Sequence, residues 1–278
     1  MNPTTEQRIR IAVAGAGGKM GREVIKLALT DPGLTLVAAV DRSRKGVDAG
    51  LLAGMEECGI AVNTDLELAL VESRPDVLVD FTIPEVVMNN ARISIKHGVR
   101  PVIGTTGLST DHLEELDKLS KEKGIGTVVA PNFSIGAILM MKFAAEAAKY
   151  MPYVEIVEYH GGQKLDAPSG TSIKTAELIA QNRQEFRQGH PDEKEIIDGS
   201  RGGLYDGFRI HSVRLPGIFA QQEVLFGGDG QTLKIRHDSY DRAGYMPGVS
   251  VAVKRVMTER GLVYGIEHFL TSSEQDNR

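Results

Sequence analysis

The stretch that decides the fold is residues 9–21, which read IRIAVAGAGGKMG. Its apolar start predicts a short strand over Ile9–Ala14. Four glycines then fall within seven residues, before a helical pattern over 22–29. Glycine lets the backbone turn sharply and lets a pyrophosphate approach the helix N-terminus closely. The segment therefore predicts a variant dinucleotide-binding turn, with its third glycine one place later than in G-x-G-x-x-G, although glycine turns also occur for packing alone.

The next predicted strand, Leu34–Val40, ends at Asp41, about twenty residues after the glycine turn, as in dinucleotide-binding folds. A carboxylate there can accept hydrogen bonds from the adenosine ribose and favours NAD; the alternative is an ordinary turn residue. Arg42, Arg44 and Lys45 follow at once, and a guanidinium can bind the 2′-phosphate of NADP. We therefore expect either NADH or NADPH to be usable.

Alternating strand and helix patterns continue through the first half of the chain. The predicted strands cover 60–62, 76–82, 101–103 and 127–130, and the helices between them cover 66–72, 84–98 and 111–123. This alternation predicts a doubly wound parallel sheet, in which ligands sit at the carboxyl ends of strands. The loops at 15–21, 41–42, 80–84, 104–107 and 130–134 are expected to share that edge.

Composition narrows the class of protein. The 278 residues are 41% hydrophobic and 25% charged with a net charge of −5, values typical of a globular protein. The acidic balance argues against a nucleic-acid partner or a membrane surface. A single cysteine, Cys58, excludes an internal disulfide, no Cys/His cluster has metal-ligand spacing, and neither a signal peptide nor a membrane span is visible. We expect a cytoplasmic protein without a metal.

A second informative stretch runs from Glu158 to Thr175, between a predicted strand and a predicted helix. Its Pro-Ser-Gly-Thr turn, residues 168–171, opens the helix, where unpaired N–H groups and the dipole attract a carboxylate or a phosphate. His160 and Lys164 would place proton donors beside that anion. The alternative is an ordinary strand, turn and capped helix with solvated charges.

In the second half of the chain, the alternation of strands and helices gives way to a long loop and several strands. Residues 184–207 predict a long loop, and strands over 209–215, 223–226 and 232–240 join the strand at 154–159 in a mixed open sheet, which would offer an oligomer interface. A helix over 248–260 and an apolar run over 262–270 return to the first domain. The expected fold class is α/β, a Rossmann-type dinucleotide-binding domain (1–131 and 241–278) with a C-terminal α+β substrate-binding and tetramerisation domain (132–240).

Taken together, these residues resemble one known family, the 4-hydroxy-tetrahydrodipicolinate reductases, historically called dihydrodipicolinate reductases. The resemblance covers nearly the whole chain, and its markers are the glycine turn at 15–21, Asp-Phe-Thr at 80–82, Gly-Thr-Thr-Gly at 104–107, Ala-Pro-Asn-Phe-Ser at 130–134 and Lys-Leu-Asp-Ala-Pro-Ser-Gly-Thr at 164–171. It implies a cytoplasmic homotetramer that reduces 4-hydroxy-tetrahydrodipicolinate, a small dicarboxylate, to tetrahydrodipicolinate in lysine biosynthesis by the diaminopimelate route. Hydride from NADH or NADPH would go to C4, with loss of water.

The resemblance also implies roles for individual residues. His160 and Lys164 match catalytic positions. The substrate-binding matches are Thr106, Ser169, Gly170 and Thr171. The cofactor-binding positions are Gly15, Gly18, Lys19, Met20, Gly21, Asp41, Arg42, Phe81, Thr82, Gly104, Thr105, Thr106, Ala130, Asn132, Phe133 and Arg242.

One position departs from the family pattern. The family has two successive histidines where this chain has His160-Gly161, and the second normally touches substrate. Losing such a contact is expected to cost on the order of 1 to 3 kcal/mol of binding. Two alternatives stay open: a related reductase with a changed substrate, and a regulatory protein that binds nicotinamide nucleotides. A semialdehyde dehydrogenase would need a nucleophilic cysteine, for which Cys58 is a poor candidate.

Overall fold

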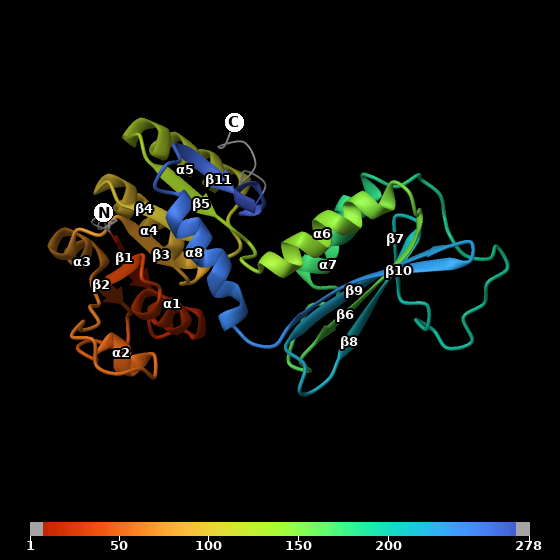
Figure 1. The fold of residues 1–278 in the computed structure, drawn as a ribbon, viewed down its shortest axis with the longest axis horizontal. Coiled ribbons are helices and arrows are strands. Elements are labelled where there is room, and N and C mark those ends of the chain that lie inside the picture. Colours follow the sequence, from red (N-terminus) through yellow and green to blue (C-terminus); the bar gives the residue numbers. More distant parts are fainter. Residues whose placement is uncertain (1–7, 271–278) are drawn as a thin grey trace, which may run out of the picture. The chain divides into compact units, whose positions relative to one another are not determined.

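Six strands form one parallel sheet in the computed structural model, which describes residues 8–270 (Figure 1). They are β1 (Ile9–Ala14), β2 (Leu34–Val40), β3 (Val77–Asp80), β4 (Arg100–Ile103), β5 (Gly126–Val129) and β11 (Gly261–Tyr264). Their order across the sheet is β11-β5-β4-β3-β1-β2, and every pairing between neighbours is parallel. The strands are short apolar runs because helices cover both faces of such a sheet.

The helices of this sheet are α1 (Lys19–Thr30), α2 (Ala49–Leu52), α3 (Leu66–Ser73), α4 (Pro84–Lys96), α5 (Thr110–Lys123) and α8 (Met246–Arg255). Helices α1 and α8 contact each other, and α3, α4 and α5 contact in succession, so the two groups lie on opposite faces (Figure 1). Leu66 and Leu70 of α3 pack against alternate residues of β1, whose Ala12 and Ala14 point to that face. The doubly wound parallel sheet expected from the alternation is confirmed.

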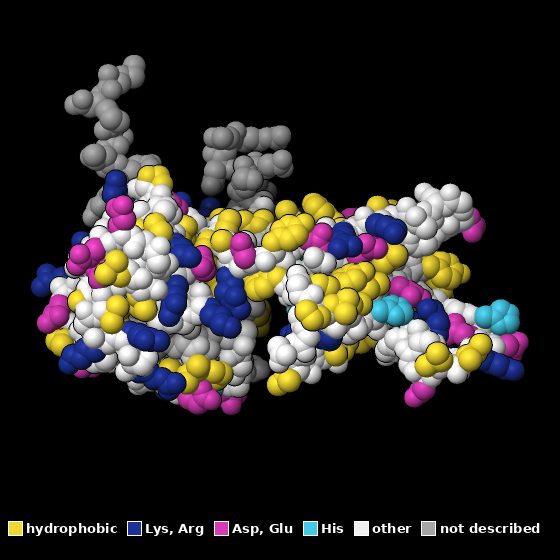
Figure 2. Space-filling view, turned by 90° about the horizontal axis from the view of Figure 1, so that it is seen from below, with side chains coloured by type: hydrophobic (Ala, Val, Ile, Leu, Met, Phe, Trp, Pro, Cys, Tyr) yellow, Lys and Arg dark blue, Asp and Glu magenta, His cyan; other side chains and the backbone are white. Residues whose placement is uncertain are grey.

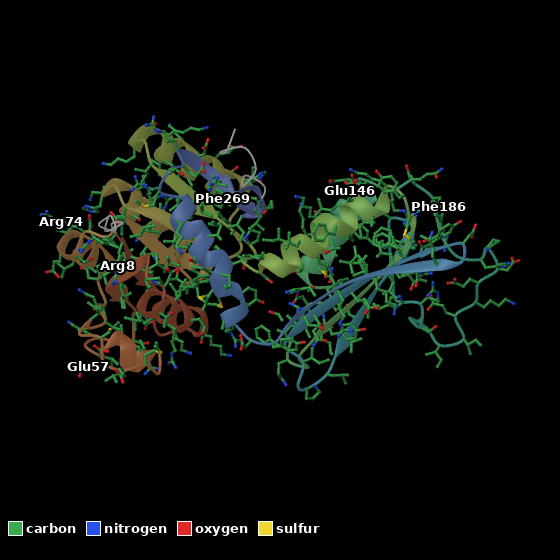
Figure 3. All side chains as sticks on the ribbon, in the orientation of Figure 1. Arg8, Glu57, Arg74, Glu146, Phe186 and Phe269 are labelled. Carbon is green, nitrogen blue, oxygen red and sulfur yellow. The ribbon has the colours of Figure 1, made fainter. Side chains whose placement is uncertain are left out.

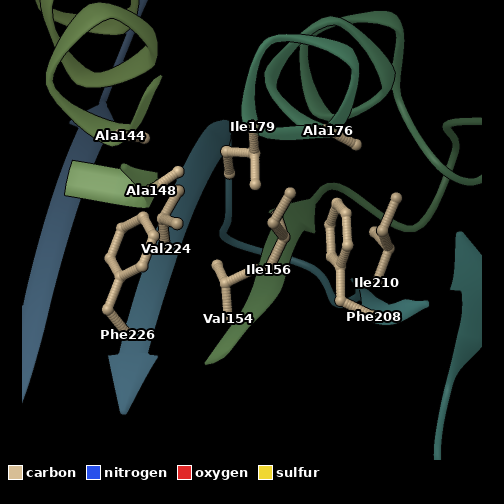
Figure 4. Close-up of a cluster of buried hydrophobic side chains, with 10 residues drawn as sticks. All are labelled: Ala144, Ala148, Val154, Ile156, Ala176, Ile179, Phe208, Ile210, Val224 and Phe226. Atoms are coloured by element: carbon tan, nitrogen blue, oxygen red, sulfur yellow. The ribbon is translucent and has the colours of Figure 1, made fainter. Parts of the chain in front are cut away.

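The second sheet is mixed. Its strands are β6 (Tyr153–His160), β7 (Gly203–Tyr205), β8 (Phe208–Arg214), β9 (Ala220–Gly228) and β10 (Gln231–Ser239), in the order β10-β9-β6-β8-β7. Only the β6–β8 pairing is parallel. One face carries α6 (Ile135–Ala148) and α7 (Gly170–Ala180), and Figure 4 shows the core between them, in which Ile156, Phe208 and Phe226 are buried.

The chain divides into two compact units, residues up to 133 together with 245 onward (unit 1) and Ser134–Gly244 (unit 2). The divisions expected from the sequence lie at 131/132 and 240/241. The η1 turn (Ala243–Tyr245) leads into α8, and η2 (Glu267–Leu270) follows β11. The assignment of a role to each unit stays a prediction.

Three local expectations were wrong. Within 60–62 only Ala61 forms a bridge, with Asp48, and the next residue, Asn63, bridges to Val40. The Asp48 carboxylate holds the residues just before this segment by accepting hydrogen bonds from the N–H groups of Cys58 and Gly59. The helix expected over 248–260 begins at Met246, since Pro247 suits a first turn, and ends at Arg255. The loop over 184–207 is interrupted by β7, which pairs with β8.

The surface and the remaining loop add three findings. On the described part of the face shown in Figure 2, Lys and Arg side chains are scattered among acidic and hydrophobic ones. The loop after α7 is anchored by Phe186, labelled in Figure 3, whose ring meets Tyr153 at 5.0 Å between centroids. Within residues 8–270, no helix is long and apolar enough to cross a membrane, and no group of three His, Cys, Asp or Glu side chains is arranged for a metal ion.

Candidate active site

The glycine turn after β1 brings backbone atoms so close together that some of its positions have no room for a side chain. Gly15 has φ +77°, and a Cβ there would lie 2.7 Å from the carbonyl oxygen of Phe81. A Cβ on Gly21 would collide with the carbonyl oxygen of Gly15. Helix α1 begins at Lys19 with Gly18 as its N-cap and no side-chain cap, so its first N–H groups are free of side-chain acceptors. Such a turn fits the close approach of a pyrophosphate.

Asp41, at the end of β2, holds the glycine turn. Its carboxylate accepts hydrogen bonds from the N–H of Gly17 at 2.8 Å and of Ser43 at 3.0 Å. Burial works against its charge, but hydrogen bonds from Ser43 and Gly17 outweigh burial and lower the pKa of Asp41. The Cγ atom of Arg44 lies 3.1 Å from where a Cβ on Gly17 would sit, and Arg44 and the predicted cofactor residue Arg42 are both exposed. Of the three basic residues that follow Asp41 in the sequence, the structure places Arg44 beside the glycine turn.

Asp80 joins the loops that follow β3 and β4. It is 1% exposed and accepts hydrogen bonds from the N–H and hydroxyl of Thr82, from Asn90 and from the hydroxyl of Thr105. Burial raises the pKa of this carboxyl, and the hydrogen bonds offset only part of that effect. Asp80 was part of a family marker but not of the predicted site, because a single sequence does not show that it is buried.

The remaining cofactor-loop residues of unit 1 lie at the same edge of the sheet. The Phe81 and Phe133 rings meet with centroids 5.6 Å apart, and a Cβ on Gly104 would overlap the Phe81 ring. Ala130 and Phe133 are buried, Met20 and Thr82 are half-buried, and Gly18, Lys19 and Thr106 are exposed. Asn132 lies in the same loop as Phe133. The carboxyl ends of β1 to β5 thus gather these predicted residues of unit 1.

In unit 2, His160 ends β6 above a buried carboxylate. Its Nδ1 lies 2.6 Å from Oε2 of Glu158. Arg214 Nη2 lies 2.7 Å from Oε1 of Glu158. Burial alone would raise the pKa of the Glu158 carboxyl, but contacts with His160, Ser212 and Arg214 lower it to about 2.

Lys164 lies in the turn that follows His160. Its Nζ is 2.8 Å from Oδ1 of Asp166, and its N–H donates to the carbonyl oxygen of Gly161. The pKa of Asp166 is lowered, first of all by the hydrogen bond from Lys164. Arg214 donates a second hydrogen bond, 2.8 Å long, to the carbonyl oxygen of Asp166. One guanidinium therefore ties the strand that carries His160 to the loop that carries Lys164.

Helix α7 opens at the end of the same loop. Ser169 is its N-cap, 3% exposed, and its hydroxyl accepts from the N–H of Ser172 and lies 3.0 Å from the Ser172 hydroxyl. The Ser169 side chain thus serves the helix itself, while Gly170 and Thr171 bring the open backbone N–H groups. Arg242, also of unit 2, lies with its guanidinium 5.2 Å from the centre of the Phe219 ring.

Comparison with known proteins identifies the family. Residues 9–133 match the model of the dihydrodipicolinate reductase N-terminus, and residues 136–270 match that of the C-terminus. The chain belongs to the dihydrodipicolinate reductase family. It is 54% identical over 267 residues to the 4-hydroxy-tetrahydrodipicolinate reductase of Bacillus pumilus (strain SAFR-032), covering 96% of this chain and 99% of that protein. The enzyme of the same name from Bacillus subtilis (strain 168) is 51% identical over 266 residues, with the same coverage.

A solved structure agrees with this family. The dipicolinate-bound dihydrodipicolinate reductase from Paenisporosarcina sp. TG-14 is 46% identical, with a TM-score of 0.85 over 94% of this chain and 99% of that one. The chain is therefore an oxidoreductase of the diaminopimelate route to lysine, which reduces 4-hydroxy-tetrahydrodipicolinate with NADH or NADPH. The sequence-based predictions of family, reaction and cofactor are confirmed.

Proposed function

We propose that His160 and Lys164 are the catalytic residues of this reductase and that the start of α7 binds a carboxylate of the substrate. The observation that carries the proposal is the loop 160–171, in which His160, Lys164 and the open N-terminus of α7 follow one another and Arg214 joins the strand to the loop. Ser169, Gly170 and Thr171 are the proposed substrate-binding residues of unit 2, and the family resemblance implies the same role for Thr106, which lies in unit 1.

The chemistry of imine reduction fits these groups. Bound NADH or NADPH supplies the hydride. The Lys164 cation can stabilise the charge of a dicarboxylate and donate a proton, and His160 offers a second donor in the same loop. The N–H groups of Gly170 and Thr171, in the first turn of α7, suit a carboxylate at a helix N-terminus. The relative of known structure is named for bound dipicolinate, a dicarboxylate, and we propose that this chain binds the same class of ligand.

The proposed cofactor site lies at the carboxyl edge of the parallel sheet in unit 1. It includes Gly15, Gly18, Lys19, Met20, Gly21, Asp41, Arg42, Phe81, Thr82, Gly104, Thr105, Thr106, Ala130, Asn132 and Phe133. Arg242, which lies in unit 2, keeps the cofactor role that the family resemblance implies. Asp41 favours an adenosine ribose, while Arg42 and Arg44 offer charge to a 2′-phosphate. We therefore propose that both nucleotides are used.

A coupled assay with freshly generated substrate tests the catalytic roles. NADH and NADPH oxidation are followed separately in wild type, His160→Ala and Lys164→Ala. We expect turnover with both nucleotides and a fall in kcat of roughly 10²-fold or more in each variant, the size typical of a lost general acid. An effect on KM alone would reassign that residue to binding, and no turnover by wild type with either nucleotide would contradict the enzyme assignment.

Gly161 is proposed to weaken substrate binding relative to a histidine-bearing enzyme. A Cβ on Gly161 would lie 3.1 Å from the carbonyl oxygen of Ile218, so a side chain fits after a small shift. We expect Gly161→His to lower KM for the substrate, because it would restore a charge-assisted contact. An unchanged KM in Gly161→His would contradict this proposal. Turnover of a different cyclic imine by wild type would favour the alternative of a changed substrate.

We further propose that the protein is a cytoplasmic homotetramer assembled through unit 2. The face of the mixed sheet opposite α6 and α7 and the loop before β7 are the proposed contacts; Ile196 in that loop is 97% exposed. The loop is fixed to the sheet by Arg201, whose Nη2 is 2.6 Å from Oε1 of Glu155. Light scattering should give four times the chain mass for wild type and less for Ile196→Asp. A monomeric wild type would refute the assembly.

A further inference from the structure

Near His160, neighbouring residues of β8, β6 and β9 form successive rows across the mixed sheet, on the side that α6 and α7 cover. Strand register places Ile156 beside Val224 and Ile210, and these three form an apolar row in the core. The next row along the strands pairs Glu158 with Gln222 and Ser212. The last row pairs His160 with Ala220 and Arg214. Ser212, Glu158 and Gln222, the polar row, therefore lie between the core and the row that carries His160.

Glu158 is the middle of the polar row and is fully buried. Its two oxygens are divided between His160 Nδ1 at 2.6 Å and Arg214 Nη2 at 2.7 Å, and Ser212 is its neighbour on β8. A carboxylate on Nδ1 restrains the ring and keeps Nε2 as the nitrogen that can face a ligand. The carboxylate is also paired with Arg214, which donates to the carbonyl oxygen of Asp166, so Arg214 links Glu158 to the loop that contains Lys164.

Gln222 restrains the start of α7, as Glu158 restrains the His160 ring. It is 4% exposed, its Oε1 accepts from the Ser172 hydroxyl at 2.7 Å, and its Nε2 donates to the Thr175 hydroxyl at 2.7 Å. Ser172 lies in turn beside the N-cap Ser169. The amide thus fixes the rotation and depth of the first turn of α7 on the sheet, which sets where the N–H groups of Gly170 and Thr171 point.

We propose that Glu158 and Gln222 are positioning residues, which hold the proton donor His160 and the carboxylate-binding start of α7 in one fixed arrangement on the sheet. The inference rests on the proposed roles of His160 and α7. Glu158 and Gln222 are suited to this task because buried polar groups with matched partners have one low-energy arrangement, whereas the neighbouring apolar row accepts small shifts. Misplacing a reacting group by about 1 Å can cost about a hundredfold in rate.

The two halves of the polar row predict different kinetic signatures. Glu158→Gln should lower kcat about tenfold or more with little change in KM, since His160 loses its restraint while α7 keeps Gln222. Gln222→Met should raise KM and the Kd for dipicolinate about tenfold and change kcat less. The matched control is Val224→Ala in the apolar row, which should lower Tm and leave kcat and KM unchanged. NADH affinity, measured by fluorescence titration, should be the same in all three.

The outcomes separate this inference from the proposed function. If His160→Ala loses turnover while folded Glu158→Gln matches Val224→Ala, the positioning role of Glu158 is wrong and the role of His160 stands. If His160→Ala keeps its kcat, the proposed function fails first. Should Glu158→Gln or Gln222→Met not fold, Ser212→Ala and Ser172→Ala each remove one partner of the polar row. Wild-type kcat and KM in both milder variants would overturn the inference.

Discussion

The two units build their ligand-facing edges from different materials. In unit 1 the edge is mostly backbone: glycine turns that leave no room for a Cβ, and one buried carboxylate, Asp80, whose partners are all neutral donors. In unit 2 it is made of charged side chains, with buried Glu158 between His160 and Arg214 and the Lys164–Asp166 pair in the loop that follows β6. A backbone edge suits a cofactor that is gripped through its phosphates; a charged edge suits a step that moves protons.

The largest expected effect comes from removing the buried charge of unit 2. The pKa of Glu158 is lowered from 4.5 to about 2, so the carboxylate form stabilises the folded chain above pH 4.5 by about 3 kcal/mol, and this is lost as pH falls from 4.5 toward 2. We expect Glu158→Gln to lower the free energy of unfolding by about that amount at pH 7. The difference from wild type should shrink below pH 4.5.

Urea unfolding at several pH values measures this difference. The matched control is Glu146→Gln on α6, labelled in Figure 3, where an exposed carboxylate lies 2.6 Å from Lys149. Exposed pairs contribute little, so the control should stay within about 0.5 kcal/mol of wild type at every pH. A Glu158→Gln difference that does not depend on pH would contradict the assignment of the stabilisation to the charge.

The next effect contrasts one substitution in the first turn of a helix in each unit. Gly21→Ala should cost about 2 to 3 kcal/mol and weaken NADH binding, because the new Cβ meets the backbone oxygen of Gly15 and displaces the turn. Gly170→Ala should leave the unfolding free energy almost unchanged, since no atom lies within 4 Å of the added Cβ. Equal losses of unfolding free energy in the two variants would contradict the view that only unit 1 builds its edge from closely packed backbone.

The same distinction explains what could be predicted from sequence. The strand, the glycine turn and Asp41 of unit 1 lie close together in the chain. A glycine also indicates directly where the backbone needs a tight turn, so the parallel sheet and the loops at its carboxyl edge were predictable. His160, Lys164 and the start of α7 were predictable for the same reason, since they occupy a single loop. Their site roles remain predictions.

What escaped prediction lies far apart in sequence. Arg214 reaches Glu158 across 56 residues, and Ser172 reaches Gln222 across 50. Polar residues at alternate positions of a strand are typical of a solvent-facing side, and nothing in a single sequence shows that Glu158 and Gln222 face inward beneath α7. The sequence offers Arg42, Arg44 and Lys45 together after Asp41, and only the path of the chain after β2 shows that Arg44 lies beside Gly17.

A smaller effect is expected for the buried carboxylate of unit 1. Burial raises the pKa of Asp80, so its charged form is disfavoured in the folded chain. Asp80→Asn removes that cost, keeps an acceptor for Thr82 and Thr105, and lets the Asn90 amide turn its oxygen to the new donor. We expect a change within about 1 kcal/mol in urea unfolding. A loss near 3 kcal/mol, as in Glu158→Gln, would show that the units do not differ in this respect.

The smallest effect separates charge from burial within unit 2 itself. Asp166 lies 2.8 Å from Lys164 but is 61% exposed, so solvent screens the pair and two long side chains lose freedom in forming it. Asp166→Asn should therefore change the unfolding free energy by less than about 0.5 kcal/mol, although the pKa of Asp166 is lowered. Since Arg214 binds the backbone oxygen of Asp166, that contact survives the substitution. A loss comparable to that of Glu158→Gln would mean that the loop charges, and not the buried carboxylate, hold this edge together.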